Sequence, residues 1–308
     1  MSTNGSGPVF GERAEYGAND VCYRHKTRPS FTLCQRCGRT VCGECQVTSA
    51  VGLLCPDCVR EATPSGAKRA GRATRVLGRR ISMMETPVTM AIIAICAVVF
   101  VLQLITHYFA SDLVTTALWY APLYSRPEVF EPWRMLTVMF THSTGFWLHI
   151  VMNMYALWVF GREIERRIGR TAFAALYVFS GIGGSLGVMF WAYVQPSAQL
   201  VPTVGASGAI FGVLGAMFVA MKAMQVDTKS LVVLLAINIG IGFLPGVSIA
   251  WQAHLGGFLI GALTMFILVR TQGPRKRGAR ITFLTLEAAL LIALSFAYFV
   301  VSPSLVLN

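Results

Sequence analysis

Long apolar segments recur between Pro87 and the C-terminus, and they restrict the fold more than any other feature of the sequence. An α-helix needs about 20 apolar residues to cross the hydrocarbon core of a bilayer. Seven segments approach that requirement: 87–109, a second that follows a loop and ends near Gly161, 172–194, 205–221, 230–245, 249–269 and 282–301. We therefore expect residues 87–302 to form an all-α polytopic membrane domain.

The rest of the chain is polar. The whole sequence is 55% hydrophobic and 13% charged, which excludes an ordinary soluble domain. The first apolar segment begins too far from the N-terminus to be a signal peptide. We predict a disordered Ser/Gly-rich N-terminus over residues 1–19, a cysteine-rich domain over 20–60, a basic linker over 61–86, and then the membrane domain.

Basic residues alternate between the connections of the membrane domain, which indicates its orientation. The connections after spans two, four and six carry most of them: Arg162, Arg166, Arg167 and Arg170; Lys222 and Lys229; Arg270, Arg275, Lys276, Arg277 and Arg280. Residues 195–204 and 243–248 contain no Lys or Arg, and residues 110–132 contain only Arg126. By the positive-inside rule, the N-terminus is cytoplasmic and the C-terminus lies outside.

Two segments outside the spans are predicted to contact membrane lipids. The linker before the first span is strongly basic and is expected to bind anionic headgroups: Arg60, Lys68, Arg69, Arg72, Arg75, Arg79 and Arg80. It has no interleaved aromatic residues that could stack on bases, so the net charge of +12 does not indicate nucleic acid. The 110–132 connection is expected to be an interfacial loop because it contains aromatic residues: Trp119, Tyr120, Tyr124 and Phe130.

Residues of the types that bind zinc are paired in the 20–60 segment. Four pairs are each separated by two residues: Cys22 and His25, Cys34 and Cys37, Cys42 and Cys45, Cys55 and Cys58. Eight ligands are sufficient for two tetrahedral Zn²⁺ ions, and the spacing alone allows several partitions between them. Disulfides are the alternative, but they need an oxidising compartment, and a histidine in a cysteine position favours metal. The segment is too small to bury a large core, so zinc should supply much of its folding free energy.

Four polar side chains from three spans lie at a similar depth in the outer half of the membrane: Ser207, His254, His149 and Asn153. Polar groups at this depth must pair or line a hydrated cavity. Ser207 begins a span within the small-residue run 204–212, where free backbone N–H groups and the helix dipole can stabilise an oxyanion. For this run alone, a helix-packing surface is the competing interpretation.

Nucleophilic catalysis accounts for these side chains together. A serine requires a base to accept its proton, and a neutral imidazole is the usual one. Glycines on both spans would let Ser207 and His254 meet: Gly205, Gly208, Gly257 and Gly261. Phe211 lies on the same face as Ser207 and should pack against the imidazole. No acidic residue lies within spans four or six, so we predict a dyad without a third member.

The oxyanion of the reaction would need hydrogen-bond donors near Ser207. His149 and Asn153 are one helical turn apart and lie on the same face of span two. Together with the Ser207 N–H, they are the predicted donors.

Three motifs, Gly205-Ala206-Ser207-Gly208, His149-x-x-x-Asn153 and His254-x-x-Gly257-x-x-x-Gly261, resemble those of the rhomboid family of intramembrane serine proteases. Trp133-Arg134 is similar to the Trp-Arg pair of that family's first external loop. His142 is similar to its additional histidine, with six residues between His142 and His149. The resemblance implies a six-helix core and, as in the larger members, a seventh C-terminal transmembrane helix.

The cysteine-rich segment resembles a B-box-type zinc finger. That resemblance implies that Cys22, His25, Cys42 and Cys45 share one ion and that Cys34, Cys37, Cys55 and Cys58 share the other. Saturated sites of this kind leave no open coordination position for chemistry. We therefore expect the domain to bind a protein partner or to regulate the membrane domain.

The rhomboid resemblance implies hydrolysis of a peptide bond in or beside the transmembrane helix of a single-pass protein. Cleavage would occur near the outer face, would need no cofactor, and would favour small residues and an easily unwound helix. Span five would be the substrate gate. The composition and the fused zinc finger suggest a bacterial plasma membrane.

Other functions remain as alternatives. A catalytically inactive relative that binds or escorts membrane proteins would be expected to lack Ser207 or His254, and both are present. A transporter would use charges at mid-span or inverted repeats, and neither was expected here. A membrane-anchored zinc-finger regulator would not need seven spans.

Overall fold

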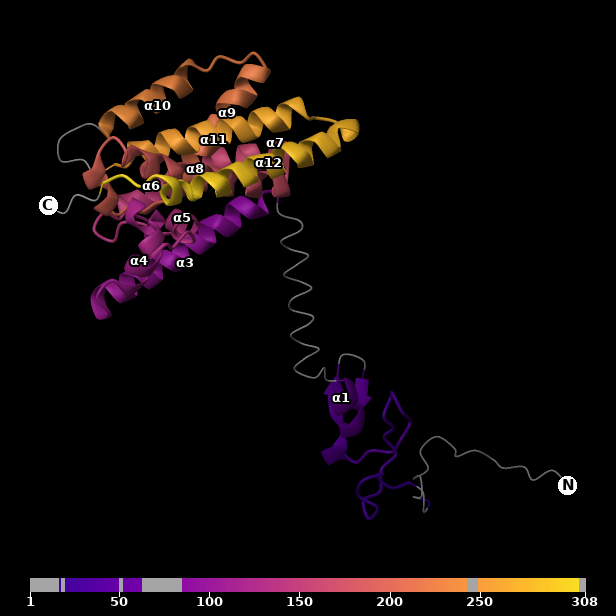
Figure 1. The fold of residues 1–308 in the computed structure, drawn as a ribbon. Coiled ribbons are helices and arrows are strands. Elements are labelled where there is room, and N and C mark those ends of the chain that lie inside the picture. Colours follow the sequence, from indigo (N-terminus) through magenta and orange to yellow (C-terminus); the bar gives the residue numbers. More distant parts are fainter. Residues whose placement is uncertain (1–16, 18–19, 50–51, 63–84, 243–248, 305–308) are drawn as a thin grey trace. The chain divides into compact units, whose positions relative to one another are not determined.

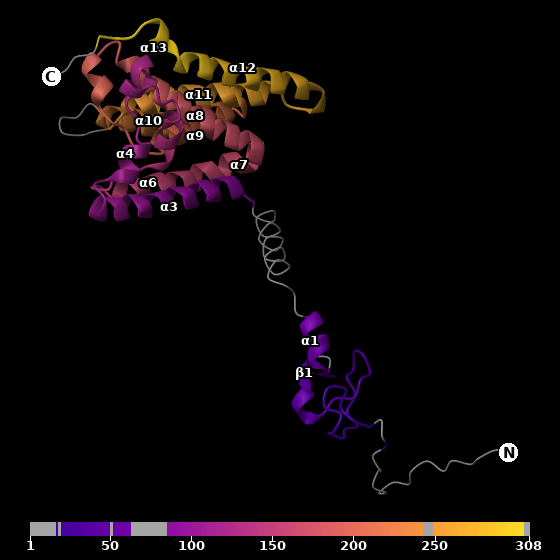
Figure 2. The ribbon, with the colours of Figure 1, turned by 60° about the horizontal axis from the view of Figure 1, so that its bottom comes forward.

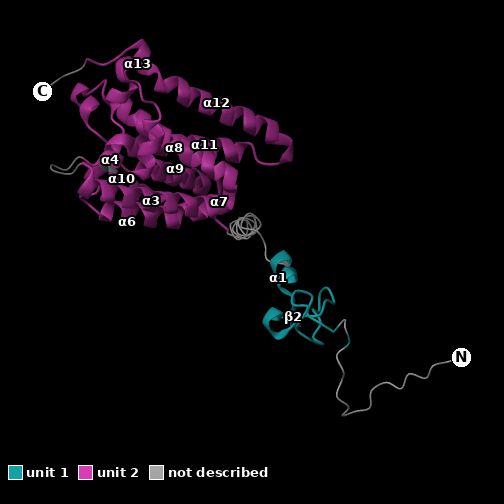
Figure 3. Cartoon of the chain, turned by 90° about the horizontal axis from the view of Figure 1, so that it is seen from below, with its two compact units in different colours: residues 1–83 teal, residues 84–308 magenta. Residues whose placement is uncertain are grey.

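The computed structural model describes residue 17 and residues 20–49, 52–62, 85–242 and 249–304. The chain forms two compact units, residues 1–83 and 84–308 (Figure 3). Most of the predicted disordered N-terminus and most of the basic linker lie outside the described residues, as does the 243–248 connection. Each unit is considered by itself.

The N-terminal unit is built around its cysteines. Its regular elements are short: η1 (Gly43–Cys45), β1 (Val47–Ser49), β2 (Gly52–Leu54) and α1 (Pro56–Ala62). The two strands are antiparallel, with Val47 opposite Leu54. Apart from cysteines, the buried apolar residues of its core are Val41 and Leu54. So small an apolar core agrees with the expectation that bound metal stabilises this unit.

The second unit is all-helical: α3 (Pro87–Phe109), α4 (Leu113–Leu118), η2 (Pro122–Ser125), η3 (Pro127–Val129), α5 (Arg134–Thr137), η4 (Val138–Phe140), α6 (Leu148–Ala156), η5 (Leu157–Gly161), α7 (Arg162–Ile168), α8 (Arg170–Trp191), η6 (Pro196–Leu200), α9 (Ser207–Ala223), α10 (Lys229–Ile241), α11 (Trp251–Arg270), η7 (Pro274–Lys276), α12 (Arg277–Ser295) and α13 (Ala297–Val300). Among the described residues, α3, α8, α11 and η7–α12 are long and apolar enough to cross a membrane. Helices α9 and α10 are shorter and apolar. The predicted all-α polytopic membrane fold is confirmed.

The end of the second span was predicted wrongly. Its helix does not stop near Gly161 but continues through the π-helical turn η5 and through α7 to Ile168. Charged residues continue it because they pair: Arg167 bonds Glu163 one turn away at 2.7 Å. Glu165 accepts hydrogen bonds from the N–H groups of Val88 and Thr89 (2.9 and 2.8 Å) and so caps α3. The following residue, Gly169, ends the helix with a φ of 82°.

The seventh span also differs from its prediction. It was expected over 282–301, but α12 begins at Arg277 and ends at Ser295, and α13 follows as a separate turn. It contains a buried acidic residue, Glu287, which accepts a hydrogen bond from Thr264 of α11 at 2.7 Å. The expectation of no charged residue within a span was therefore wrong. Figure 2 shows α12 and α3 on opposite sides of the bundle.

Most aromatic residues of the predicted interfacial loop are packed within the protein. Tyr120 is fully buried; its hydroxyl bonds Ser125 at 2.7 Å, and its carbonyl accepts the Thr203 N–H at 2.7 Å. The guanidinium of Arg134 lies 4.0 Å from the ring centre of Tyr124. Residues after α3 are thereby tied to the segment that precedes α9, a long-range contact that local composition does not predict.

Helices α8, α9 and α11 form the centre of the bundle and pack against one another (Figures 1 and 2). Glycines make this possible: a Cβ on Gly257 would overlap the carbonyl oxygen of Gly208, and one on Gly261 would overlap that of Gly212. The predicted close approach of spans four and six is therefore present, and it holds the ends that carry Ser207 and His254 together.

Gly257→Ala should consequently separate α9 from α11. The added methyl meets backbone, which cannot rotate away, so we expect a loss of stability of about 1–3 kcal/mol or more. Thermal unfolding in detergent measures it. Gly278→Ala in α12 is the matched control, because nothing lies within 4 Å of a Cβ there. Equal unfolding midpoints for the two variants would contradict the packing argument.

Candidate active site and metal-binding clusters

Ser207 is the first residue of α9, and its backbone is set by the residue two positions earlier. Gly205 has a φ of 132°, which a residue with a side chain rarely adopts. Its N–H donates to the carbonyl of Val138 at 3.2 Å. The first turn of a helix has N–H groups without intrahelical acceptors, and Ser207 lies among them.

His254 of α11 lies against this serine. The Nε2–Oγ distance between His254 and Ser207 is 3.0 Å, and His254 is 6% exposed. The ring of Phe211 stacks on the imidazole, with centroids 3.9 Å apart and planes 6° from parallel. The predicted contact and the predicted role of Phe211 as a packing partner are both present in the structure.

The other ring nitrogen of His254, Nδ1, has no hydrogen-bond partner within the described part of the chain. A neutral imidazole that accepts at Nε2 carries its proton on Nδ1. The arrangement therefore has the geometry of a serine–histidine pair without an acidic third residue. It can remove the proton from Ser207.

The predicted oxyanion donors lie at the start of α6. The ring of His149 points at the turn before Ser207: a Cβ on Gly205 would be 2.8 Å from its Nε2 and 3.6 Å from Ser207 Oγ. The Ser143 N–H faces His149 Nδ1 at 3.4 Å. Asn153 is buried and donates one amide proton to the carbonyl of His149 at 2.7 Å. The structure thus brings three of the four predicted side chains around one point and places Asn153 one turn away.

A small pocket of about 30 Å³ opens at Ser207, which is enough for a water molecule. Its wall includes Val204, Gly205 and Gly208 around the serine, Ser185 of α8 and Ala253 beside His254. A polar atom and small residues next to the hydroxyl leave space for a carbonyl group and for water.

Two further residues of the first external loop were singled out from the sequence. Arg134 is buried and donates to the carbonyls of Thr116 and Trp119 at 2.7 and 3.1 Å, so it organises the loop without lining the pocket. Trp133 beside it is 54% exposed. His142 is fully buried, and its ring meets that of His149 edge-on at 5.4 Å.

Sequence reasoning missed two polar residues that support these elements. Gln103 of α3 bonds the backbone of His142, and Glu165 caps α3. Gln103 is the only amide side chain in an apolar span. Such a residue signals a buried polar contact, although it does not reveal the partner.

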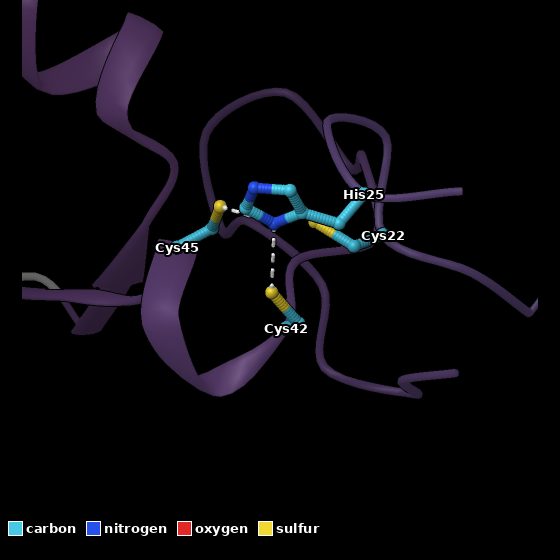
Figure 4. Close-up of side chains that lie close together, drawn as sticks. All are labelled: Cys22, His25, Cys42 and Cys45. Carbon is cyan, nitrogen blue, oxygen red and sulfur yellow. Dashed lines mark hydrogen bonds between the residues drawn. The ribbon is translucent and has the colours of Figure 1, made fainter. Parts of the chain in front are cut away.

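The eight paired residues of the N-terminal unit form two clusters: Cys22, His25, Cys42 and Cys45, and Cys34, Cys37, Cys55 and Cys58. In each cluster the ligand atoms lie within 4.8 Å of one another. Figure 4 shows the ring of His25 between the sulfurs of Cys42 and Cys45, which lie 3.3 and 3.5 Å from its Nδ1. The interleaved partition implied by the B-box resemblance is the one observed.

These distances fit a tetrahedral metal. Zn–S bonds of about 2.3 Å and Zn–N bonds of about 2.0–2.1 Å imply ligand separations of about 3.8 Å between sulfurs and about 3.6 Å between sulfur and nitrogen. The Sγ atoms of Cys37 and Cys55 are 3.8 Å apart, whereas a disulfide would need about 2.05 Å. All eight cysteines of the chain are free thiols.

The clusters also favour the thiolate form that metals bind. Burial raises the pKa of the Cys34 thiol, but hydrogen bonds from backbone N–H groups, among them that of Cys55 at 3.2 Å, outweigh it and lower the pKa to about 6. The pKa of Cys22 is likewise lowered to about 6, against the effect of burial. Each cluster therefore contains a ligand that is readily deprotonated near neutral pH.

Known proteins resemble the membrane unit. Residues 129–271 match the family model described as "Rhomboid domain". RHOMBOID-like protein 5 of Arabidopsis thaliana is 36% identical over 149 residues, which is 46% of each chain. Rhomboid protease GluP of Bacillus subtilis is 37% identical over 174 residues, 54% of this chain and 31% of GluP.

Rhomboid protease AarA of Providencia stuartii gives the longest of these matches, 29% identity over 250 residues, 71% of this chain and 85% of AarA. The chain spans less than half the length of RHOMBOID-like protein 5 and of GluP. The matched family region includes Ser207, His254, His149 and Asn153 and excludes the N-terminal clusters and α12. The membrane unit therefore contains a rhomboid domain, and the chain belongs to the rhomboid family.

Proposed function

We propose that this chain is an intramembrane serine endopeptidase with Ser207 as nucleophile and His254 as general base. One observation supports it above all: Ser207 Oγ and His254 Nε2 are 3.0 Å apart within an apolar helical bundle. A packing hydroxyl would not require a stacked, buried imidazole at that distance. Two of the relatives, GluP and AarA, are named as rhomboid proteases.

In the proposed reaction, His254 Nε2 takes the hydroxyl proton as Ser207 Oγ bonds to the scissile carbonyl carbon. The resulting tetrahedral oxyanion collapses, the C–N bond breaks, and His254 returns the proton to the leaving amine. Water from the outer face then attacks the acyl-enzyme by the same steps and releases the carboxylate. The stacked Phe211 keeps the imidazole in place through both proton transfers.

The oxyanion would be stabilised by the Ser207 N–H, by His149 Nε2–H and by the second amide proton of Asn153. Asn153→Ala should therefore lower kcat by about 10- to 1,000-fold and leave the fold intact. Cleavage of a single-pass reporter in detergent measures it. Asn238→Ala is the matched control, because Asn238 makes the same hydrogen bond to a carbonyl four residues earlier (2.8 Å) but lies on α10. An unchanged kcat for Asn153→Ala would exclude it as a donor.

We propose single-pass membrane proteins as substrates, cut near the outer face. A helix exposes its scissile carbonyl only after local unwinding, so small or helix-weakening residues near the cut should favour cleavage. The proposed orientation places the N-terminus in the cytoplasm and the C-terminus outside a bacterial plasma membrane, because basic residues gather at η7, α7 and the start of α10.

For the N-terminal unit we propose two structural Zn²⁺ ions and a role in partner binding or regulation. Four-ligand clusters leave no open position for substrate. Residues 20–60 would be the zinc-binding domain, 61–86 a lipid-contacting linker, and 87–302 the catalytic domain. Deletion of residues 1–60 with unchanged substrate choice and turnover would exclude a regulatory role.

A fluorophosphonate probe tests the proposed enzyme without a known substrate. The detergent-solubilised full chain would be labelled, and the adduct located by intact mass and peptide mapping. We expect one adduct on Ser207 that is absent in His254→Ala. A folded protein without an adduct would contradict the proposal and favour a non-catalytic protein that binds membrane partners.

A further inference from the structure

A buried glutamine of the first membrane helix has no part in the reaction above, yet its contacts lead to His149. Gln103 of α3 is 0% exposed. An amide in apolar surroundings is costly unless its oxygen and both N–H groups are paired. The structure pairs all three.

Two of these hydrogen bonds go to one backbone residue. Gln103 Oε1 accepts the N–H of His142 at 2.9 Å, and Gln103 Nε2 donates to the carbonyl of His142 at 2.9 Å. The third goes from Nε2 to Thr115 Oγ1 of α4 at 3.1 Å. The double contact is the donor–acceptor pair that a neighbouring β-strand would offer. It holds His142 against a helix 39 residues earlier in the sequence.

The position of His142 in turn determines the surroundings of His149. The next residue, Ser143, presents its N–H to His149 Nδ1 at 3.4 Å. The His142 ring lies edge-on to that of His149. Its own ring nitrogens have no hydrogen-bond partner among the described residues. The contacts of Gln103 with its backbone are therefore the polar contacts that hold His142.

An N–H donor at Nδ1 selects one tautomer of a neutral imidazole. Nδ1 must offer its lone pair, so the proton is on Nε2. His149 Nε2 faces the turn that contains Ser207. In this tautomer His149 presents a donor to a developing oxyanion, whereas the other would present a lone pair and repel it.

We propose that Gln103 is a positioning residue that keeps His149 in the Nε2–H tautomer through the backbone of His142 and Ser143. Its consequence for catalysis rests on the function proposed above. The tautomer itself is a property of the folded protein and can be observed in a protein without activity.

The test compares two variants of the full-length protein in detergent. Gln103→Met keeps the length of the side chain and removes its polar atoms, and Thr115→Val removes only the third contact. Nitrogen-15 NMR of labelled histidines reports the tautomers, and His149→Ala identifies the His149 signals among the five histidines. We expect Nε2–H for His149 in the wild type and in Thr115→Val, and a mixture of tautomers in Gln103→Met.

Kinetics provide a second readout. We expect Gln103→Met to lower kcat for a single-pass reporter by about 10- to 100-fold with KM within about threefold, and Thr115→Val to stay within about threefold in both. In a His149→Ala background, Gln103→Met should cost less than about threefold, because the two residues act as a unit.

An unchanged His149 tautomer in folded Gln103→Met, or a full additional loss in the His149→Ala background, would overturn the proposal. If Gln103→Met does not fold, Gln103→Leu is measured in the same way. A wild type that neither cleaves the reporter nor reacts at Ser207 would refute the proposed function instead, and the tautomer comparison would still decide the role of Gln103.

Discussion

Ser207→Ala and His254→Ala are each expected to abolish cleavage of a single-pass transmembrane reporter, with kcat reduced about 10³-fold or more. Without the Oγ there is no nucleophile, and without the imidazole nothing takes its proton at neutral pH. Because the two side chains act as a unit, the double variant should be no slower than either single variant. Reporter fragments resolved by mass spectrometry measure the loss.

The control for this experiment is a serine that lies away from the pocket. Ser295 of α12 is buried and donates to the carbonyl of Ile292 at 2.6 Å, so Ser295→Ala also removes one buried hydroxyl. Its activity should stay within about threefold of wild type. Thermal unfolding must show that Ser207→Ala is folded. Cleavage near the wild-type rate by folded Ser207→Ala would eliminate the dyad.

Removal of zinc should unfold residues 20–60 and leave the membrane domain intact. Metal binding supplies an apparent free energy of about 10–16 kcal/mol to small zinc domains, and the apolar core here is too small to replace it. We expect elemental analysis to find two zinc ions in the purified chain. After chelation, amide signals of the N-terminal unit should collapse to random-coil positions while Ser207 labelling continues at an unchanged rate.

Single-ligand variants sharpen this prediction. Cys34→Ser breaks one cluster and Cys22→Ser the other, so each should reduce the zinc content by one ion. Cys96, the eighth cysteine, lies in α3 outside both clusters, and Cys96→Ser should leave both ions bound. Loss of Ser207 labelling upon chelation would instead mean that the two units depend on each other.

The sequence by itself determined the class of the protein and most residues of the candidate site. Apolar length against bilayer thickness is a one-dimensional measure, so the spans could be read without knowledge of their packing. Alternating basic connections then assigned a depth to Ser207, His254 and His149. Ligand types at a fixed spacing marked the metal-binding segment in the same local way.

Tertiary contacts decided the rest, because they join residues that are distant in the chain. The helix that carries His149 runs on to Ile168 since Glu165 caps α3, and Tyr120 is buried since its backbone pairs with Thr203. The interleaving of the two metal clusters depends on the path of the chain between the pairs. Gln103 meets His142 only after α3 and the external loop have packed together. Spacing along a sequence records which groups are available, and folding in three dimensions selects the partners that satisfy them.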